Sequence, residues 1–237
     1  MNSPRVIAIT GSSRGAGLGF ARHFAESKGW IVHGCSRGQS EYSHPNYTHT
    51  VADMGVDADA RRWVRTVKQA AGRVDVLLCN AGVVKSALMT PVLPTDLFMS
   101  FFESSFKATF VICREMSKLM IGQRFGSIVT IGSSMTIVHE PGTAAYSANK
   151  AAVAEFTKVL ARELAPHGVT CNVLAPSLIQ TLSSDAMGED WRKRILALQT
   201  IQRPVDVSEL AAVVEFFAAD TSKCITGQVI TTCFVAP

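Results

Sequence analysis

The sequence lacks a long hydrophobic run and lacks a strong excess of charge of one sign. Glu215 interrupts the best late apolar stretch, and Arg5–Thr10 already has the pattern of a strand. We therefore expect neither a membrane span nor a signal peptide. The formal net charge of the 237-residue chain is only +4, and its basic residues form no sustained stripe. This argues against a nucleic-acid-binding surface, and we expect a cytoplasmic protein that binds neither nucleic acid nor membrane.

The sequence also lacks closely spaced cysteines. Its six cysteines are scattered along the chain without a C-x-x-C motif. Cys35, Cys79 and Cys171 fall in apolar runs, where a free cysteine behaves as a small hydrophobic residue, and this favours a reducing compartment. His44 and His49 lie in a polar loop at a spacing that matches no common metal motif, so no metal site is predicted.

No internal repeat, low-complexity tract or linker divides the chain. Hydrophobic residues make up 47% of the sequence and charged residues 18%, a composition typical of a globular protein with a large core. The loosest stretch, 38–46, is only as long as a loop. We therefore predict one domain over residues 1–237, a size that α/β domains commonly reach.

Short apolar runs alternate with longer helical patterns along the whole chain. The predicted strands are Arg5–Thr10, Trp30–Cys35, Tyr47–Val51, Asp75–Cys79, Ser127–Ile131, Val169–Leu174 and Gln228–Thr232. The predicted helices are 17–28, 58–71, 95–121, 145–165 and 207–219. Because the strands are apolar on both faces, they suit a parallel sheet that is covered by helices. The order predicts an α/β, doubly wound (Rossmann) sheet of about seven parallel strands.

A row of phenylalanines marks the predicted helix at 95–121. Phe98, Phe102, Phe106 and Phe110 are four residues apart and therefore share one helix face. The stripe has two interpretations: it packs onto the sheet, or part of it faces another subunit.

A glycine-rich turn, TGSSRGAGLG, follows the first predicted strand, with glycines at 11, 15, 17 and 19. Between a strand and a helix, such a turn lets backbone N–H groups and the helix N-terminus approach a pyrophosphate. The spacing is not the usual G-x-G-x-x-G. Its position directly after the first strand is nevertheless the one that a dinucleotide site requires.

The end of the second predicted strand bears on the choice of cofactor. An acidic residue there normally binds a free ribose 2′-OH, but Gly34-Cys35-Ser36-Arg37 contains none. Arg37, Ser36 and Arg14 instead offer guanidinium groups and a hydroxyl, which suit a 2′-phosphate. The alternative is that both arginines only face solvent. The pattern favours NADP(H) over NAD(H).

Three residues further along have the chemistry of proton transfer. Tyr146 and Lys150 lie four apart in the alanine-rich stretch AAYSANKAA, so they share a helix face, where an ammonium lowers the pKa of a neighbouring phenol. Ser133 directly follows the predicted strand at 127–131. A carbonyl at this edge would accept hydrogen bonds from Ser133 and Tyr146 while a hydride arrives. Tyr146 would then act as general acid, or as base in the reverse direction.

Taken together, TGSSRGAG, Asp53, CNAG (79–82), Ser133, YSANK and APSLIQT (175–181) resemble the short-chain dehydrogenase/reductase family, in particular its NADPH-dependent 3-oxoacyl-(acyl-carrier-protein) reductases. The resemblance extends from Arg5 to about Gln228. It implies a proton-donor role for Tyr146, ribose binding by Lys150, a carbonyl contact from Ser133, and a homodimer or homotetramer that pairs through 95–121 and 145–165. It also implies cofactor contacts from Gly11, Ser13, Arg14, Gly15, Ala16, Asp53, Met54, Asn80, Ala81, Gly82, Pro176, Ile179 and Thr181.

The sequence departs from the family pattern at four places. Ser105 replaces an asparagine that completes a proton relay through water in the family. Its shorter side chain would add one more water to the relay or hydrogen-bond to the carbonyl four residues back. The other departures, at Cys79, at Ser177 and in the C-terminal TTCFVAP, have the character of structural changes.

The segment 182–200 is expected to form a lid over the substrate pocket. Met135, Val138, Met187 and Trp191 would make this pocket apolar, which suits an acyl or polyketide-like chain. The sequence thus predicts an NADP(H)-dependent oxidoreductase acting on a small-molecule or carrier-tethered ketone or secondary alcohol. The alternatives are an NADP(H)-binding sensor with impaired catalysis, which only Ser105 favours, and an interaction protein on the same fold.

Overall fold

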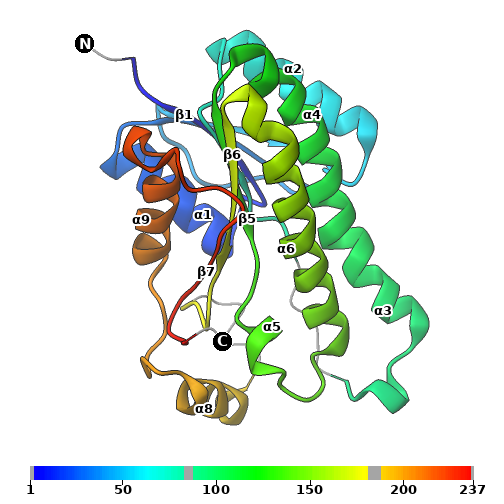
Figure 1. Ribbon diagram of the computed structural model, residues 1–237. Coiled ribbons are helices and arrows are strands. Elements are labelled where there is room, and N and C mark those ends of the chain that lie inside the picture. Colours follow the sequence, from blue (N-terminus) through cyan, green and yellow to red (C-terminus); the bar gives the residue numbers. More distant parts are fainter. Residues whose placement is uncertain (1–2, 83–87, 181–187, 236–237) are drawn as a thin grey trace.

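The computed structural model describes residues 3–82, 88–180 and 188–235 (Figure 1). Over these residues seven parallel strands form one sheet in the order β3-β2-β1-β4-β5-β6-β7. The strands are β1 (Val6–Thr10), β2 (Ile31–Ser36), β3 (Tyr47–Val51), β4 (Val76–Cys79), β5 (Gly126–Ile131), β6 (Val169–Ala175) and β7 (Val229–Thr231). Each overlaps its predicted segment, so the predicted α/β parallel sheet is confirmed.

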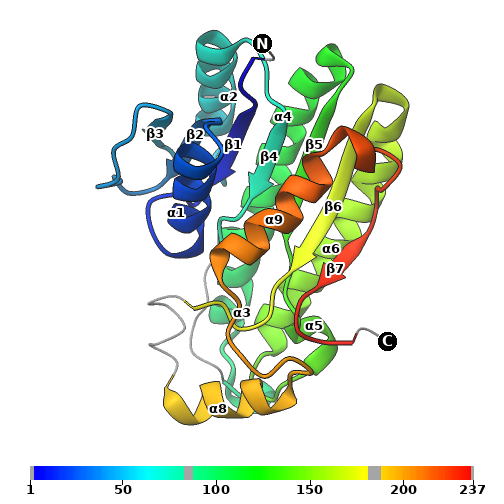
Figure 2. The ribbon, with the colours of Figure 1, turned by 90° about the vertical axis from the view of Figure 1, so that its left-hand side faces the viewer.

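Helices cover both faces of this sheet. They are α1 (Gly15–Arg22), α2 (Asp57–Ala71), α3 (Thr95–Phe101), α4 (Ala108–Gln123), α5 (Met135–Val138), α6 (Ala144–Leu164), α8 (Glu189–Leu198) and α9 (Val207–Ala218). Helices α1 and α9 lie on one face, and α2, α4 and α6 lie on the other (Figures 1 and 2). No helix within the described ranges is long and apolar enough to cross a membrane.

The two faces of the sheet carry separate hydrophobic clusters, because successive side chains of a strand point to opposite sides. Ile7 and Ile9 of β1 belong to the cluster beneath α1 and α9, together with Phe20. Ala8, between them, belongs to the cluster beneath α2, α4 and α6, which contains the fully buried Trp63. A strand that is apolar on both faces is thus explained by burial on both faces.

The predicted helix at 95–121 is interrupted rather than uniform. A π-helical segment, η3 (Phe102–Lys107), separates α3 from α4. At its start, the Asn149 side chain of α6 donates a hydrogen bond of 2.8 Å to the Phe101 carbonyl. Such π-helical turns often occur at functional sites, and this one contains the buried Ser105.

The phenylalanine stripe does not pack onto the sheet, so that interpretation was wrong. Phe106 and Phe110 instead make edge-to-face contacts with Phe156 of α6, at centroid distances of 6.0 and 5.9 Å. Phe110 remains 40% exposed. Other residues of α4, among them Ile112 and Met116, form the contact with the sheet. The stripe therefore runs along the outer side of α3, α4 and α6.

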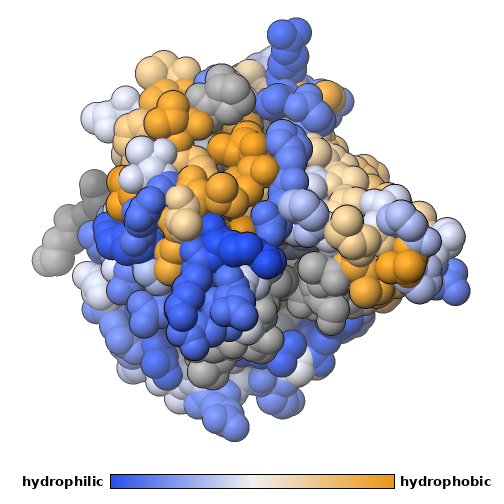
Figure 3. Space-filling model, turned by 90° about the horizontal axis from the view of Figure 1, so that it is seen from below, coloured by the Kyte–Doolittle hydropathy of each residue, from blue (hydrophilic) through white to orange (hydrophobic). Residues whose placement is uncertain are grey.

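The strand order determines where a ligand can bind. The chain proceeds outward from β1 through β2 to β3 on one side, and from β4 through β7 on the other. In such sheets the crevice for a ligand opens at the carboxyl ends of the strands beside this reversal. Helices α5 and α8 lie next to this edge (Figure 1), and Figure 3 views the molecule from that side, where hydrophobic areas adjoin hydrophilic ones.

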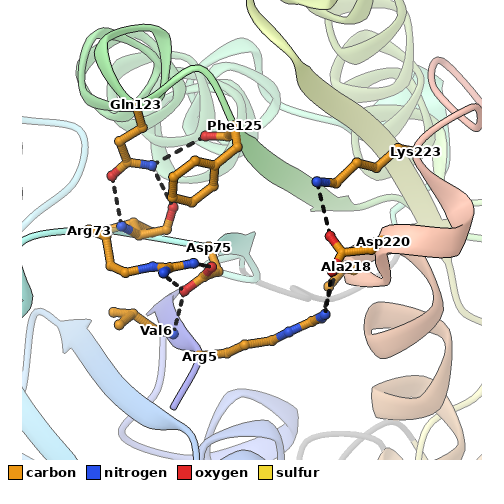
Figure 4. Close-up of polar contacts among 10 residues, drawn as sticks. Arg5, Val6, Arg73, Asp75, Gln123, Phe125, Ala218, Asp220 and Lys223 are labelled. Carbon is orange, nitrogen blue, oxygen red and sulfur yellow. Dashed lines mark hydrogen bonds and ion pairs between the residues drawn. The ribbon is translucent and has the colours of Figure 1, made fainter. Parts of the chain in front are cut away.

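The opposite, amino edge of the sheet carries a network of paired charges (Figure 4). Asp75 accepts hydrogen bonds from the Arg73 guanidinium and, at 2.8 Å, from the Val6 N–H. Lys223 pairs with Asp220 at 2.9 Å, and Arg5 donates to the Ala218 carbonyl at the end of α9. These contacts connect β1, β4 and α9 where the strands begin.

Candidate active site

A cleft of about 1630 Å³ opens at the carboxyl edge of the sheet. The structure brings almost all of the predicted site residues to its wall, although they come from many separate segments. Those lining it are Gly11, Ser13, Arg14, Gly15, Ala16, Arg37, Asp53, Met54, Asn80, Ala81, Gly82, Ser133, Tyr146, Lys150, Pro176 and Ile179. Ser105 lies behind the wall, and Thr181 lies outside the described residues.

The glycine-rich turn is held open by its glycines and by β4. Gly11 has a φ of +71°, and a Cβ at Gly17 would lie 2.1 Å from the Gly11 carbonyl oxygen, so neither position has room for a side chain. The Asn80 side chain donates to the Thr10 carbonyl at 3.1 Å, which ties the end of β4 to the end of β1. The turn thereby exposes the N-terminus of α1 to the cleft, where it can bind an anion.

The two arginines predicted to select the cofactor lie at one end of the cleft. Arg14 and Arg37 are both exposed, and neither forms an ion pair with another residue in the described ranges. Ser36 differs from the expectation, because its hydroxyl already donates to the Gly38 carbonyl at 2.7 Å. The donors available to an anion here are therefore the two guanidinium groups.

The residues predicted to border an adenine lie just beyond β3. Asp53 accepts a hydrogen bond of 2.9 Å from the Gly55 N–H, while Met54 is buried. The carboxylate therefore stabilises the turn that it belongs to, and the methionine supplies an apolar surface at the edge of the cleft.

The three predicted catalytic residues lie together. Helix α6 places Lys150 one turn after Tyr146, with the Lys150 Nζ atom 5.9 Å from the centroid of the tyrosine ring. The ammonium donates to the Ile131 carbonyl at the end of β5, at 2.8 Å. Ser133, which follows β5, lies close enough to the Tyr146 hydroxyl to favour its phenolate form. Its own oxygen accepts from the Met135 N–H at 3.2 Å, which orients the serine.

The electrostatics of this trio differ from the prediction. Burial raises the pKa of Tyr146, and the nearby Ser133 hydroxyl only partly offsets this. Burial also lowers the pKa of Lys150 to about 8. The predicted net lowering of the Tyr146 pKa is not found, because burial outweighs the effects that favour the phenolate. At neutral pH the phenol consequently keeps the proton that it would donate.

Ser105 does not form the hydrogen bond to its own helix that was one of its two predicted arrangements. Its Oγ atom is buried and has no hydrogen-bond partner among the residues that the structure describes. The Phe101 carbonyl, four residues back, accepts from Asn149 instead. A Cβ placed on Gly82 would lie 3.5 Å from Lys150 Nζ and 3.6 Å from Ser105 Oγ. The lysine and the serine thus approach the same space beside Gly82.

The backbone after β6 presents the last group of predicted residues. The Pro176 carbonyl accepts from the Ser134 N–H at 3.0 Å, and the Leu178 carbonyl and the Gln180 N–H both pair with Val205. Because successive peptide groups in an extended segment point to opposite sides, the N–H and C=O of Ile179 point away from Val205. They are not used in this pairing.

The other end of the cleft is apolar. Met135, Leu178 and Ile195 form a small buried cluster with Val138 and Trp191. Helix α8 supplies Trp191 and Ile195 from within the predicted lid, whereas Met187 lies outside the described residues. Sequence reasoning missed Leu178, Ile195, Ser134 and Asn149. Asn149 carried a signal, because it is a polar residue between Tyr146 and Lys150 in an alanine-rich helix.

The strand order, the open glycine-rich turn and the hydroxyl pair beside a buried lysine define a nicotinamide-dependent oxidoreductase of the Rossmann type. Residues 11–233 match the model of a family described as enoyl-(acyl carrier protein) reductase. The 3-oxoacyl-(acyl-carrier-protein) reductase of Rickettsia conorii is 33% identical over 230 residues, covering 94% of this chain and 92% of its own. That of Escherichia coli K12 is 30% identical over 232 residues, with 95% and 94% covered.

Among solved structures, a bacterial reductase shares the fold over nearly the whole length of both chains. It is a 3-ketoacyl-(acyl-carrier-protein) reductase from Brucella melitensis complexed with NADH, with a TM-score of 0.88, 22% identity and 96% of each chain covered. The chain belongs to the short-chain dehydrogenase/reductase family. The predicted membership is confirmed, and the protein is an oxidoreductase that acts on CH–OH groups or the corresponding ketones.

Proposed function

We propose that this chain, as one domain over residues 1–237, transfers a hydride between NADP(H) and a ketone or secondary alcohol on an acyl or polyketide-like substrate. The observation that carries the proposal is the Ser133–Tyr146 hydroxyl pair, with Lys150 one turn away, at the wall of the cleft. These two hydroxyls can both donate to one carbonyl oxygen, and such preorganised donors stabilise the charge that develops on it.

Tyr146, Ser133 and Lys150 each have a separate role in the proposed reaction. When bound, NADPH supplies the hydride that forms the new C–H bond. The Tyr146 hydroxyl gives its proton to the carbonyl oxygen, so that a ketone becomes a secondary alcohol, while Ser133 holds that oxygen by a hydrogen bond. Lys150 lies beside the resulting phenolate and faces the space that it shares with Ser105. A proton can return to Tyr146 from this side.

NADP(H) is the form of the cofactor that the charges favour. No carboxylate stands at the end of β2, where a free 2′-OH would be bound. Arg14 and Arg37 line the cleft there without pairing to an acid of the described chain. An arginine–phosphate contact is charge-assisted and often bidentate, so the 2′-phosphate of NADP(H) would compensate both positive charges.

The substrate proposal rests on the apolar end of the cleft. Met135, Leu178 and Ile195 are buried there beside Tyr146, and apolar side chains of this kind can accommodate an acyl chain. The bacterial relatives are named as reductases of 3-oxoacyl groups on acyl carrier protein. We therefore propose a 3-oxoacyl thioester, free or tethered to a carrier, as the substrate class.

We also propose that the chain forms a homodimer or homotetramer through α4 and α6. Phe110 and Val159 on these helices are 40% and 56% exposed, and pairing would bury them. Sedimentation at micromolar concentration should show the assembly, whereas a monomer would contradict it.

The direct test of the proposed function is turnover against a panel of substrates. The panel pairs ketones, including 3-oxoacyl thioesters of several chain lengths, with the matching secondary alcohols. NADPH oxidation should be fastest with a 3-oxoacyl thioester, and NADP⁺ should be reduced by the corresponding alcohol. If the chain binds NADPH but turns over no member of the panel, the proposal is wrong.

A further inference from the structure

A chain of hydrogen bonds connects the edge strand β3 to the glycine-rich turn. Tyr47 and His49 are two residues apart in β3, so their side chains share one face of the sheet. The Tyr47 hydroxyl lies 2.8 Å from His49 Nδ1 and 3.0 Å from the hydroxyl of Ser12. Ser12 belongs to the turn and is fully buried. The edge strand therefore reaches the turn after β1 by crossing over β2.

The crossing is possible because residue 34 is a glycine. Gly34 of β2 is paired with His49 in the sheet. A Cβ at Gly34 would lie 2.2 Å from Ser12 Oγ and 2.7 Å from the Tyr47 hydroxyl oxygen, so any side chain there would occupy the path of the contact. The φ of Gly34 is not positive. It is the missing side chain, not backbone freedom, that the contact requires.

The other end of the chain reaches the loop after β2. His49 Nε2 lies 2.9 Å from the Gly38 carbonyl and 3.2 Å from the Ser36 hydroxyl. Because a carbonyl can only accept, Nε2 must carry the proton, and Nδ1 of a neutral ring then accepts from Tyr47. The bonds therefore run in one direction, from Ser12 through Tyr47 and His49 to Gly38, and each donor has an acceptor.

This arrangement fixes the backbone on both sides of Arg37. Ser36 and Gly38, its two neighbours, are held by His49 and by their own hydrogen bond of 2.7 Å. Glycine in a loop is otherwise conformationally free, and an arginine on a mobile loop would lose more entropy on binding an anion. Fixing Gly38 thus prepares the Arg37 side chain for a ligand in the cleft.

We propose that Tyr47 and His49 are positioning residues that give the site its selectivity for the 2′-phosphate of NADP(H), by holding the loop that carries Arg37. The inference rests on the proposed use of NADP(H). NAD(H) lacks the 2′-phosphate, so its affinity does not depend on the position of Arg37. The two cofactors therefore separate this role from a general contribution to folding.

The experiment compares the dissociation constants of NADPH and NADH for the parent, His49→Leu and His49→Gln. In His49→Leu the NADPH constant should rise about 3- to 10-fold, the equivalent of one net hydrogen bond, while the NADH constant changes less than about twofold. In His49→Gln the side-chain amide can donate to Gly38 and accept from Tyr47. The selectivity should therefore stay within about twofold of the parent.

Tyr47→Phe provides a second variant that removes only one oxygen from the chain of hydrogen bonds. It should weaken NADPH binding in the same direction and by less, because His49 keeps its contact with Gly38. If His49→Leu weakens both cofactors equally or neither, or if His49→Gln loses as much selectivity as His49→Leu, the positioning role is overturned and the proposed function stands. If the parent binds NADH as tightly as NADPH, the NADP(H) assignment and this inference both fail.

Discussion

The two edges of the sheet differ in whether their polar groups have partners within the protein. At the amino edge, Asp75 and Asp220 each contact a cation (Figure 4). Around the carboxyl edge, by contrast, three buried polar atoms have no partner within the described residues: Ser105 Oγ, Ser134 Oγ and Trp191 Nε1. An unsatisfied buried group typically costs about 1–3 kcal/mol. The amino edge therefore stabilises the fold, and the carboxyl edge keeps its hydrogen-bonding capacity for ligands.

The difference extends to buried charge. Lys150 is a buried lysine whose ammonium donates to a carbonyl and lies over the face of a tyrosine ring. Burial lowers its pKa, because the ammonium is less well solvated inside the protein than in water. If the cleft is the functional edge, changes there should alter catalysis or binding, and changes at the amino edge should alter stability alone.

The largest expected effect is that of Tyr146→Phe. The change removes the proton-donating hydroxyl and keeps the ring that packs against Phe101. General acid catalysis typically contributes about 10²–10⁴-fold, so kcat should fall to about 1% of the parent or less. The NADPH dissociation constant, measured by titration, should stay nearly unchanged. A variant that keeps most of the parent rate would exclude Tyr146 as the acid.

Arg37→Asp should have the next largest effect. Losing a charge-assisted contact to a phosphate costs about 1.5–3 kcal/mol, which corresponds to an increase of about ten- to a hundredfold in the NADPH dissociation constant. NADH binding should be little affected. Calorimetry with both cofactors measures the two constants, and equal constants in the parent would remove the basis of the assignment.

Lys150→Met should stabilise the cofactor-free protein while abolishing efficient turnover. In the parent, the folded-state pKa of Lys150 is about 8, below the ordinary value of 10.5. Below pH 8 the buried group is charged in both states, so its desolvation cost is fully present. Between these pKa values only the unfolded state holds the proton, and the stability of the parent rises with pH.

The expected gain for Lys150→Met at pH 7 is about 1–3 kcal/mol, after subtracting the lost hydrogen bond to Ile131. Denaturant unfolding of parent and variant at several pH values measures it. The difference should shrink as the pH rises from about 8 toward 10.5. A gain that does not change with pH would show that the ammonium is not the cause.

At the amino edge, Asp75→Asn should lower the free energy of unfolding by about 1–2 kcal/mol, because it weakens a partly exposed contact with Arg73. The steady-state rate per folded molecule and the affinity for NADPH should remain at parent values. Asp220→Asn is the matched control: its side chain is 78% exposed, so it should leave the free energy of unfolding almost unchanged. A large change in kcat for Asp75→Asn would break the distinction between the edges.

The smallest expected effect is that of Ser105→Asn. The serine hydroxyl faces the same space as Lys150, so a water there can connect them, and the longer asparagine would shorten this relay. We expect kcat to change less than about tenfold. If the parent is inactive and Ser105→Asn restores turnover, the serine disables the site, and the alternative of an NADP(H)-binding sensor with impaired catalysis holds.

The sequence was sufficient for the sheet and for the members of the cleft wall, because parallel strands that are apolar on both faces place all of their following loops at one edge. Tyr146, Lys150 and Ser133 could be combined for this reason. The direction of the pKa shift of Tyr146 could not be predicted from the sequence, since desolvation depends on packing from several elements. The π-helical turn at Ser105 could not be predicted either. It has no pattern of its own and accompanies a tertiary hydrogen bond from Asn149.

In the proposed reaction, the carboxyl-edge cleft transfers a hydride to a carbonyl carbon while Tyr146 protonates the oxygen. The most direct measurement uses NADPH that carries deuterium at the transferable position of the nicotinamide ring, with a 3-oxoacyl thioester as the acceptor. Mass spectrometry of the product should find one deuterium on the carbinol carbon with the parent enzyme, and almost none with Tyr146→Phe under the same conditions. An alcohol product without deuterium, or equal labelling by Tyr146→Phe at the parent rate, would contradict the account.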